Sequence, residues 1–368
     1  MPGTVLMVGS DVGDGCFADC LARTEVNDMK KMIKRIGAAI LCAGLLVSAT
    51  GCSFSWDDLF NPGNGADSIQ VEVPSSYDEE IANKYSTFVL LGVDAREGQL
   101  YSGVNSDVIM ITSINKETNE VRVASVYRDT IMQMNDGTYN KVNYAQAKWN
   151  ASETVNVLNR NLDLYISNYV IVNWAAAATT VNLVGGVEVD VTEPMLPYLN
   201  GYLTETVNCT EIGSVQLTQA GLQTLDGPQT VAYCRIRSLD SDYQRTERQR
   251  EVVSQILSKA KAAGPGTTLQ IAAIVLANSQ TSFSWDDIAA MCSNIGAYSM
   301  TESTGFPFEK TSMEYSSLTP EISWPCFANG FATNVTELHQ FLYGEDQADY
   351  TPSATVMEID AALTLETE

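Results

Sequence analysis

The stretch STFVLLGVD, residues 86–94, reads as a buried β-strand that ends in an acidic residue. A loop then leads to Asp107 and a second apolar run, VIMITSI. The turn NKETN returns the chain as EVRVASVYRD, residues 120–129, whose alternation of apolar and polar residues predicts a third strand. The sequence therefore predicts three strands in close succession.

Charged residues stand at the loop-proximal ends of these three strands. Asp94 and Arg96 follow the first strand, Asp107 precedes the second, and Arg128 and Asp129 end the third. Ligand sites in α/β proteins gather at such strand ends. We therefore expect a polar site at this edge of a sheet.

The rest of the chain alternates predicted strands and helices. SNYVIVNW (167–174) and VEVDV (187–191) read as strands, and AAAATTVNLV (175–184) between them reads as a helix. Thr218 is predicted to start a helix that ends near Asp226, and QTVAYCRI then forms the next helix after Pro228. This order predicts a single α/β domain with a central mixed β-sheet flanked by helices.

One window concentrates arginine although the chain carries a net charge of −24. It is AYCRIRSLDSDYQRTERQR, residues 232–250, with Arg235, Arg237, Arg245, Arg248 and Arg250. Guanidinium groups bind phosphate oxygens bidentately, so the window could form an anion pocket. It could equally be a salt-bridged helix face, because several acidic residues stand among the arginines.

Asp242 is expected to cap a helix that runs to about Ala263. On that helix Asp242, Arg245 and Gln249 are spaced three and four residues apart and share one face. Cations near a helix N-terminus are unfavourable unless an anion is bound there. This favours a phosphate site, although Asp242 and Glu247 could also neutralise the cluster.

Composition limits the class of protein. With 45% hydrophobic and 18% charged residues, a chain of 368 residues is globular, and its acidity argues against nucleic acid as a partner. His339 is the only histidine, so a serine or cysteine protease-like triad is not expected, and a packing role is predicted for it. Cys234 is predicted to be buried or disulfide-bonded.

The first 84 residues differ in character from the remainder of the chain. Residues 1–28 are interpreted as an upstream extension from a wrong start. Residues 29–52, MKKMIKRIGAAILCAGLLVSATGC, combine a basic start, an apolar run and small residues, which predicts a secretory signal. Its end resembles a lipoprotein box, so Cys52 is a candidate for lipidation; an ordinary signal peptide or a short uncleaved anchor are the alternatives. Residues 53–84 read as a flexible tether.

Export would place four cysteines in a compartment where disulfides persist. Four cysteines permit three pairings, and the sequence does not choose among them. They are Cys209, Cys234, Cys292 and Cys326.

An ordered set of motifs resembles the LytR-CpsA-Psr family. The motifs are GVDAR (92–96), SD (106–107), SVYRD (125–129), NKVNYA (140–145), VGGVEVD (184–190), LDGPQTVAYCRIR (225–237) and DYQRTERQR (242–250). The resemblance implies a catalytic domain over residues 85–262. Residues 263–368 are expected to continue the same domain, or to form a small module with an acidic tail.

The resemblance implies a phosphotransferase anchored at the outer face of the cell membrane of a Gram-positive bacterium. Such proteins transfer a phosphoglycan, such as a teichoic acid or capsule polymer, from a polyprenyl-pyrophosphate carrier to peptidoglycan. By position, Asp94 and Asp107 would hold Mg²⁺. The other expected site residues are Arg128, Arg235 and Arg237 in catalysis, and Arg96, Lys141, Asp242, Arg245 and Gln249 around the pyrophosphate.

Two residues depart from the family pattern. Asn105 stands where an arginine two residues before the second aspartate is usual, and Tyr127 replaces a proline. The loss of that arginine motivates an alternative, a protein that binds polyprenyl pyrophosphate without turnover. Simple hydrolysis of the carrier pyrophosphate is a third possibility.

Overall fold

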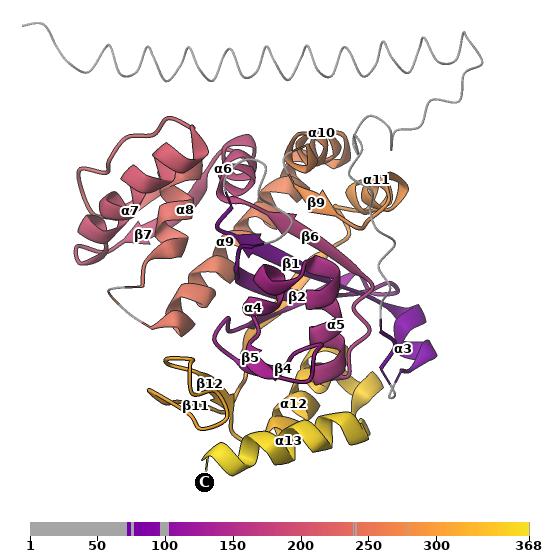
Figure 1. Ribbon diagram of the computed structural model, residues 1–368. Coiled ribbons are helices and arrows are strands. Elements are labelled where there is room, and N and C mark those ends of the chain that lie inside the picture. The colour runs from indigo at the N-terminus through magenta and orange to yellow at the C-terminus, as the bar shows by residue number, and fades with distance from the viewer. Residues whose placement is uncertain are drawn as a thin grey trace, which may run out of the picture. The chain divides into compact units, whose positions relative to one another are not determined.

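The computed structural model describes residues 72–74, 77–95, 103–237, 239, 241–277 and 279–367 (Figure 1). All of them belong to one compact unit, residues 60–368. The predicted signal segment with Cys52, most of the predicted tether, and Arg96 lie outside the described residues. Within the described part of the chain, no helix has both the length and the apolar character needed to cross a bilayer.

The centre of the unit is a six-stranded sheet with the order β10-β3-β2-β1-β6-β9. β2 runs antiparallel to both of its neighbours, β1 and β3, and β1–β6 and β3–β10 are parallel pairs. The mixed sheet and its flanking helices confirm the predicted fold class. The strands are β1 (Tyr85–Val93), β2 (Ser106–Asn115), β3 (Glu120–Val126), β6 (Asn168–Val172), β9 (Gln280–Thr281) and β10 (Ser299–Phe306).

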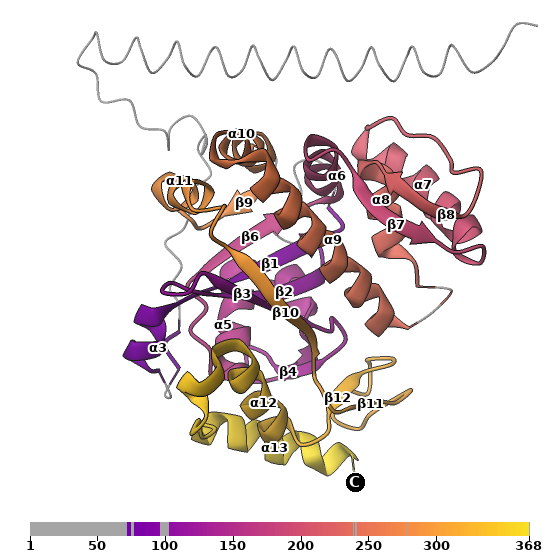
Figure 2. The ribbon, with the colours of Figure 1, turned by 180° about the vertical axis from the view of Figure 1, so that it is seen from behind.

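Helices cover both faces of this sheet, with α5 over one face and α9 crossing the other (Figures 1 and 2). The helices are α3 (Glu79–Lys84), α4 (Tyr144–Lys148), α5 (Ala151–Leu162), α6 (Trp174–Leu183), α7 (Met195–Thr210), α8 (Gly227–Arg235), α9 (Asp242–Ala263), α10 (Pro265–Leu276), α11 (Trp285–Ser293), α12 (Phe331–Tyr343) and α13 (Ala354–Thr367). Three two-stranded ribbons complete the fold: β4 (Ile131–Gln133) with β5 (Tyr139–Lys141), β7 (Val187–Val191) with β8 (Gly221–Leu225), and β11 (Lys310–Ser312) with β12 (Cys326–Ala328).

Strand β1 shows why two different cores form. Its residues alternate between fully buried and partly buried, and Val89, Leu91 and Val93 are at most 1% exposed. These three belong to the large core beneath α5 and α12. Phe88 and Leu90 point the other way and pack with β2, β3 and α9 around a smaller core. This second face is less tightly filled and borders a large cavity.

The predicted helix from Thr218 to Asp226 is wrong, because residues 221–225 form strand β8 instead. The sequence GLQTL alternates in burial and pairs with β7, so that Val187 lies opposite Leu225. An amphipathic segment of five residues suits either element, and the partner strand decides between them. Helix α8 then follows as predicted, with Arg235 as its last residue.

Helix α9 begins at Asp242, but its N-cap is Ser241 rather than Asp242. The Ser241 hydroxyl accepts from the backbone N–H of Gln244, whose side chain accepts from the backbone N–H of Ser241. This capping box satisfies the helix end without Asp242. The Asp242 carboxylate is therefore available to the arginines.

Helices α6 and α8 approach each other closely at Gly227. A Cβ atom at this position would lie 2.1 Å from the carbonyl oxygen of Ala178. The backbone N–H of Gly227 also donates to the side chain of Asn182 at 2.7 Å. Only glycine fits here, and the contact fixes the start of the helix that carries Arg235.

Gly227→Ala is expected to lower the free energy of unfolding by about 2–3 kcal/mol, because the new methyl group collides with backbone that cannot move away. Gly201→Ala is the matched control. Gly201 lies within α7, where a Cβ atom would meet no other atom within 4 Å, so alanine there is expected to stabilise by about 0.5–1 kcal/mol. Urea unfolding of residues 60–368 measures both, and equal effects would contradict the tight α6–α8 contact.

Candidate active site

A cavity of about 510 Å³ lies between the second face of the sheet and helices α6, α8 and α9. Most of its lining is apolar and comes from β1, β2, α6, α8 and α9. The apolar lining residues include Leu90, Val108, Met110, Ala177, Val231, Val253 and Ile256. The charged and amide side chains that line it are Asp94, Asp107, Asn173, Arg235, Arg237, Arg245 and Gln249. Six of the ten predicted site residues therefore line one cavity.

Apolar and polar lining residues are separated along α9. Arg245 and Gln249 stand in the first half of the helix. Val253 and Ile256 follow in its second half and line the same cavity. From Arg245 to Ile256 the helix rises about 16 Å. The cavity thus has a charged end near the start of α9 and an apolar body beyond it.

A β-bulge brings Asp107 into the cavity. Gly92 pairs with Val108 and Val93 pairs with Ser106, so Asp107 is the extra residue between the two pairs. In a regular strand Asp107 and Val108 would point to opposite faces, whereas here both line the cavity. Gly92 allows the close approach, because a Cβ atom there would lie 2.8 Å from the Cβ of Val108.

The bulge also sets Asp107 beside Asp94. Asp94 directly follows Val93, the residue that pairs with Ser106, so the end of β1 and the start of β2 deliver both carboxylates to the same edge. This register agrees with the prediction that charged residues gather at the ends of neighbouring strands.

Arg128 contacts the site through Asp107. Its Nη1 atom lies 2.6 Å from Oδ1 of Asp107, and its Nε atom lies 3.7 Å from Asp129. Burial lowers the pKa of Arg128, but the two carboxylates outweigh burial and the pKa is raised. Arg128 therefore stays charged and orients Asp107 rather than lining the cavity itself.

Arg245 is the most deeply buried cation of the site, with 3% of its surface exposed. Its Nη2 atom lies 3.0 Å from Oδ1 of Asp242 and donates to the carbonyl oxygen of Asp107 at 3.1 Å. Arg237 donates to the same Asp242 oxygen at 3.1 Å. Burial lowers the pKa of Arg245 to about 10, although Asp242 opposes the shift. One carboxylate thus holds two arginines at the charged end of the cavity.

Several polar atoms in this cluster are buried without a hydrogen-bond partner in the described part of the chain. They are the Nε atoms of Arg237 and Arg245, Oδ2 of Asp242 and Oε1 of Gln249. The two Nε–H groups are buried donors on cations, which are costly to leave unsatisfied, and an anion would satisfy them with strong charge-assisted bonds, whereas the two oxygens need a donor. The cluster therefore suits a ligand with phosphate oxygens.

Arg235 is held by aromatic and acidic side chains that the sequence did not single out. Its guanidinium carbon lies 3.7 Å from the centre of the Trp174 ring and 5.1 Å from that of Tyr202. Its Nη2 atom lies 2.6 Å from Glu205, and Nη1 donates to Thr206 at 3.0 Å. Nothing in the local sequence of α7 signals this role, because the contacts join segments about 30 to 60 residues apart.

Of the two remaining predicted residues, the structure describes only Lys141. The Nζ atom of Lys141 lies 2.8 Å from Asp129, and Lys141 does not line the cavity. Arg96 lies outside the described residues. Asn105, which replaces the usual arginine, is exposed just before β2.

Cys234 lines the cavity but is not suited to act as a nucleophile. Burial raises the pKa of its thiol to about 12, so the thiolate is scarce at neutral pH. The structure has Cys209, Cys234, Cys292 and Cys326 as free thiols.

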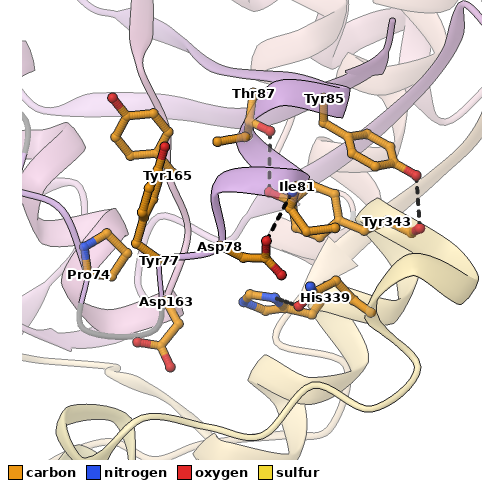
Figure 3. A pocket seen from close by; sticks show the side chains of 12 residues that line it. Pro74, Tyr77, Asp78, Ile81, Tyr85, Thr87, Asp163, Tyr165, His339 and Tyr343 are labelled. Atoms are coloured by element: carbon orange, nitrogen blue, oxygen red, sulfur yellow. Dashed lines mark hydrogen bonds between the residues drawn. The ribbon is translucent and has the colours of Figure 1, made fainter. Parts of the chain in front are cut away.

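His339 is buried and lines a small pocket with Tyr85 and Tyr343 (Figure 3), in agreement with the packing role predicted for it. It stacks on Tyr350 with ring centres 3.6 Å apart, and its Nε2 atom donates to the carbonyl oxygen of Leu162 at 2.8 Å. Burial lowers its pKa, so the ring is neutral. The neighbouring cavity of about 30 Å³, lined also by Tyr77 and Tyr343, has room for little more than water.

The described residues contain no group of three or more His, Cys, Asp or Glu side chains placed to hold a metal ion. Mg²⁺ binds through one or two carboxylates and takes its other ligands from water and phosphate oxygens. Asp94 and Asp107, both on the cavity wall, fit that type of site. They do not form a complete protein cage for a metal.

The arrangement by itself defines a class of site. A long apolar cavity that ends in two carboxylates and three arginines fits an amphiphile with a polyanionic head and an apolar tail.

The family is evident from the sequence. Residues 63–317 match the model of the LytR_cpsA_psr family. TagU of Enterococcus faecalis, named a polyisoprenyl-teichoic acid–peptidoglycan teichoic acid transferase, is 28% identical over 263 residues, which are 70% of this chain and 81% of TagU. TagT of Bacillus subtilis, with the same designation, is 32% identical over 176 residues, which are 47% of this chain and 52% of TagT.

Known structures agree with the fold. The crystal structure of B. subtilis TagT superposes with a TM-score of 0.54 at 25% identity, over 72% of this chain and 93% of TagT. A TagT structure with bound octaprenyl pyrophosphate lipid gives a TM-score of 0.52 at 22% identity, over the same shares, and shows the common fold. This chain belongs to the LytR-CpsA-Psr family. The expected resemblance is confirmed, and the relatives' names confirm the expected enzyme class, a transferase.

Asp242→Asn is expected to lower the free energy of unfolding by about 2–3 kcal/mol, because it leaves buried Arg245 and Arg237 facing each other without a carboxylate. Glu205→Gln is the matched control. It also removes an arginine partner, but the Glu205 side chain is 60% exposed, and the expected loss is below about 1 kcal/mol. Urea unfolding of residues 60–368 compares them, and a smaller loss for Asp242→Asn would contradict the central role of this carboxylate.

Proposed function

We propose that the chain transfers a phosphoglycan from a polyprenyl-pyrophosphate carrier to peptidoglycan and forms a phosphodiester link during cell-wall assembly. The single observation that carries the proposal is the cavity whose apolar body ends in Asp94, Asp107, Arg235, Arg237 and Arg245. The names of TagU and TagT and the lipid bound to a TagT structure support it.

In this proposal the two parts of the cavity bind different parts of the donor. The apolar body takes the start of the polyprenyl tail, since the lining of β1, β2 and α9 offers only packing contacts there. The pyrophosphate lies at the charged end, where Arg245 and Arg237 neutralise its oxygens. Arg235, fixed by Trp174 and Glu205, reaches the same end from α8.

The transfer needs positioning and charge neutralisation more than covalent chemistry by the protein. The oxygen of a peptidoglycan sugar hydroxyl bonds to the glycan-bearing phosphorus, and the bridging P–O bond of the pyrophosphate breaks. Polyprenyl monophosphate leaves with the electron pair, and the hydroxyl proton passes to solvent. The arginines stabilise the charge that grows on the leaving phosphate.

We propose Mg²⁺ as the cofactor, held by Asp94 and Asp107 together with the donor pyrophosphate. When bound, it would neutralise charge on the pyrophosphate oxygens. Arg128 orients Asp107 through its 2.6 Å contact. The Asp107 carboxylate has a second oxygen for the ion.

We also propose that the domain works at the outer face of the cytoplasmic membrane of a Gram-positive bacterium. The support is the sequence of residues 29–52, with its basic start, apolar run and terminal Cys52 as lipidation site. A donor with a polyprenyl tail is itself confined to the membrane, so an anchored enzyme meets it there.

The test uses residues 60–368, a short-chain polyprenyl pyrophosphate that carries a sugar, Mg²⁺ and peptidoglycan fragments. We expect Mg²⁺-dependent release of polyprenyl monophosphate and linkage of the sugar phosphate to the fragments. Asp107→Ala and Arg235→Ala are each expected to lower the rate at least about 100-fold, because each removes charge at the reacting phosphate.

Asp136→Ala and Arg160→Ala are the matched controls. Each removes a charged side chain that is ion-paired, to Lys148 and Glu72 respectively, and that does not line the cavity. They are expected to retain the wild-type rate. Release of phosphate without linkage to the fragments would favour hydrolysis of the carrier, and binding without any release would favour the binding protein.

The binding protein is the second candidate because Asn105 replaces the arginine usual at that position. We expect the wild type to be active, and Asn105→Arg to raise its turnover by about tenfold without changing lipid affinity. Asn105→Gln controls for the substitution itself. A wild type with no turnover that gains it only through Asn105→Arg would establish the binding protein instead.

A further inference from the structure

The ribbon β11–β12 is joined to the charged end of the cavity but is not part of it. Thr311 pairs with Phe327, and the pairing continues outward through Trp324, whose backbone N–H donates to the carbonyl oxygen of Glu314 at 3.0 Å. Both views show the ribbon beside the start of α9 (Figures 1 and 2). The ribbon therefore extends from the site toward solvent.

One face of the ribbon meets the start of α9. Lys310, Ser312 and Glu314 alternate along β11 and its extension, so they share a face. The Nζ atom of Lys310 lies 4.6 Å from the centre of the Tyr243 ring, and the Ser312 hydroxyl lies 3.3 Å from the Tyr243 hydroxyl. Tyr243 is the neighbour of Asp242, the carboxylate that holds the two cavity arginines.

Trp324 stands at the outer end of this pairing. Its backbone meets that of Glu314 beyond the last paired residues of β11 and β12. Glu314 lies two positions beyond Ser312, which places Trp324 about 7 Å farther out than the contact with Tyr243. Its backbone has φ of +55°, an uncommon conformation for an aromatic residue.

A second contact fixes the base of the ribbon to the site. The backbone N–H of Cys326 donates to the carbonyl oxygen of Asp129 at 2.9 Å, and Thr130 forms a β-bridge with Cys326. Asp129 adjoins Arg128, which binds Asp107. The ribbon is thus anchored at Asp129 and at Tyr243, the chain neighbours of Arg128 and Asp242.

The tip of the ribbon is aromatic and acidic. Trp324 is 62% exposed and Tyr315 is 64% exposed, whereas most aromatic rings of the described chain are at least partly buried. Residues 313–325, MEYSSLTPEISWP, contain Glu314 and Glu321 and no basic residue. This charge disfavours an anionic polymer, so the donor phosphoglycan does not fit here. A neutral sugar polymer does, because a ring packs on the C–H face of a sugar and carboxylates accept from its hydroxyls.

We propose that the exposed tip of the β11–β12 ribbon, with Trp324 as its main contact, binds the neutral glycan strand of the acceptor and leads its hydroxyl to the charged end of the cavity. This rests on the proposed transferase function, since it identifies where the second substrate of that site lies. The ribbon and the apolar cavity approach the arginines from different sides, as a donor and an acceptor must.

The test is a titration of the full chain, purified in detergent, with an uncharged N-acetylglucosamine oligomer, followed by calorimetry. Trp324→Ala is expected to weaken binding about tenfold, which corresponds to one lost stacking contact. Trp324→Phe keeps a ring and is expected to stay within about threefold of the wild type. Tyr198→Ala removes another exposed ring, on α7, and is expected to leave binding unchanged.

Donor binding is measured in the same samples, with a short-chain polyprenyl pyrophosphate. Retained donor affinity in Trp324→Ala shows that the variant is folded, and its acceptor KM is then expected to rise while donor hydrolysis stays constant. If the wild type binds donor but no glycan, or if Trp324→Ala binds glycan as the wild type does, the acceptor subsite is refuted and the transferase proposal stands.

Other outcomes separate the two proposals further. Glycan binding that depends on Trp324, without any donor binding, would support the subsite and remove the proposed function. If the exposed tip instead joins two copies of the chain or attaches to anionic vesicles, and loses that contact in Trp324→Ala without an effect on glycan, the acceptor subsite is overturned.

Discussion

The site depends on one carboxylate that holds two cations in place. Oδ1 of Asp242 meets both Arg237 and Arg245, and Arg245 in turn donates to the backbone of Asp107 on β2. These contacts tie the start of α9 to the sheet edge. Because Arg245 is almost fully buried, its charge is tolerated only with this carboxylate or a bound anion nearby. The same constraint that stabilises the helix start therefore prepares it for phosphate.

Much of this could be predicted from the sequence, because local patterns carry it. The apolar run before Asp94 predicted β1, and the three- and four-residue spacing of Asp242, Arg245 and Gln249 predicted a shared face. Strand β8 was missed because a short alternating segment is defined by its partner, which lies more than thirty residues away. The bulge at Asp107 leaves no mark in the sequence at all.

Contacts between distant segments account for the rest of what the sequence could not show. Trp174 and Glu205 hold Arg235, yet neither adjoins a recognisable motif. Lys141 shows the opposite case, a motif residue that pairs with Asp129 outside the cavity. A motif therefore identifies which residues the family uses, whereas packing decides which of them reach the ligand.

The parallel pairing of β10 with β3 has a consequence for how the chain folds. β10 (residues 299–306) forms the edge of the sheet and pairs with β3, which ends at Val126. About 170 residues must therefore be synthesised between these two strands. Pairing across such a separation is slow, because a large loop must close before any contact forms. The nascent chain thus cannot complete its central sheet until the last quarter of its sequence emerges.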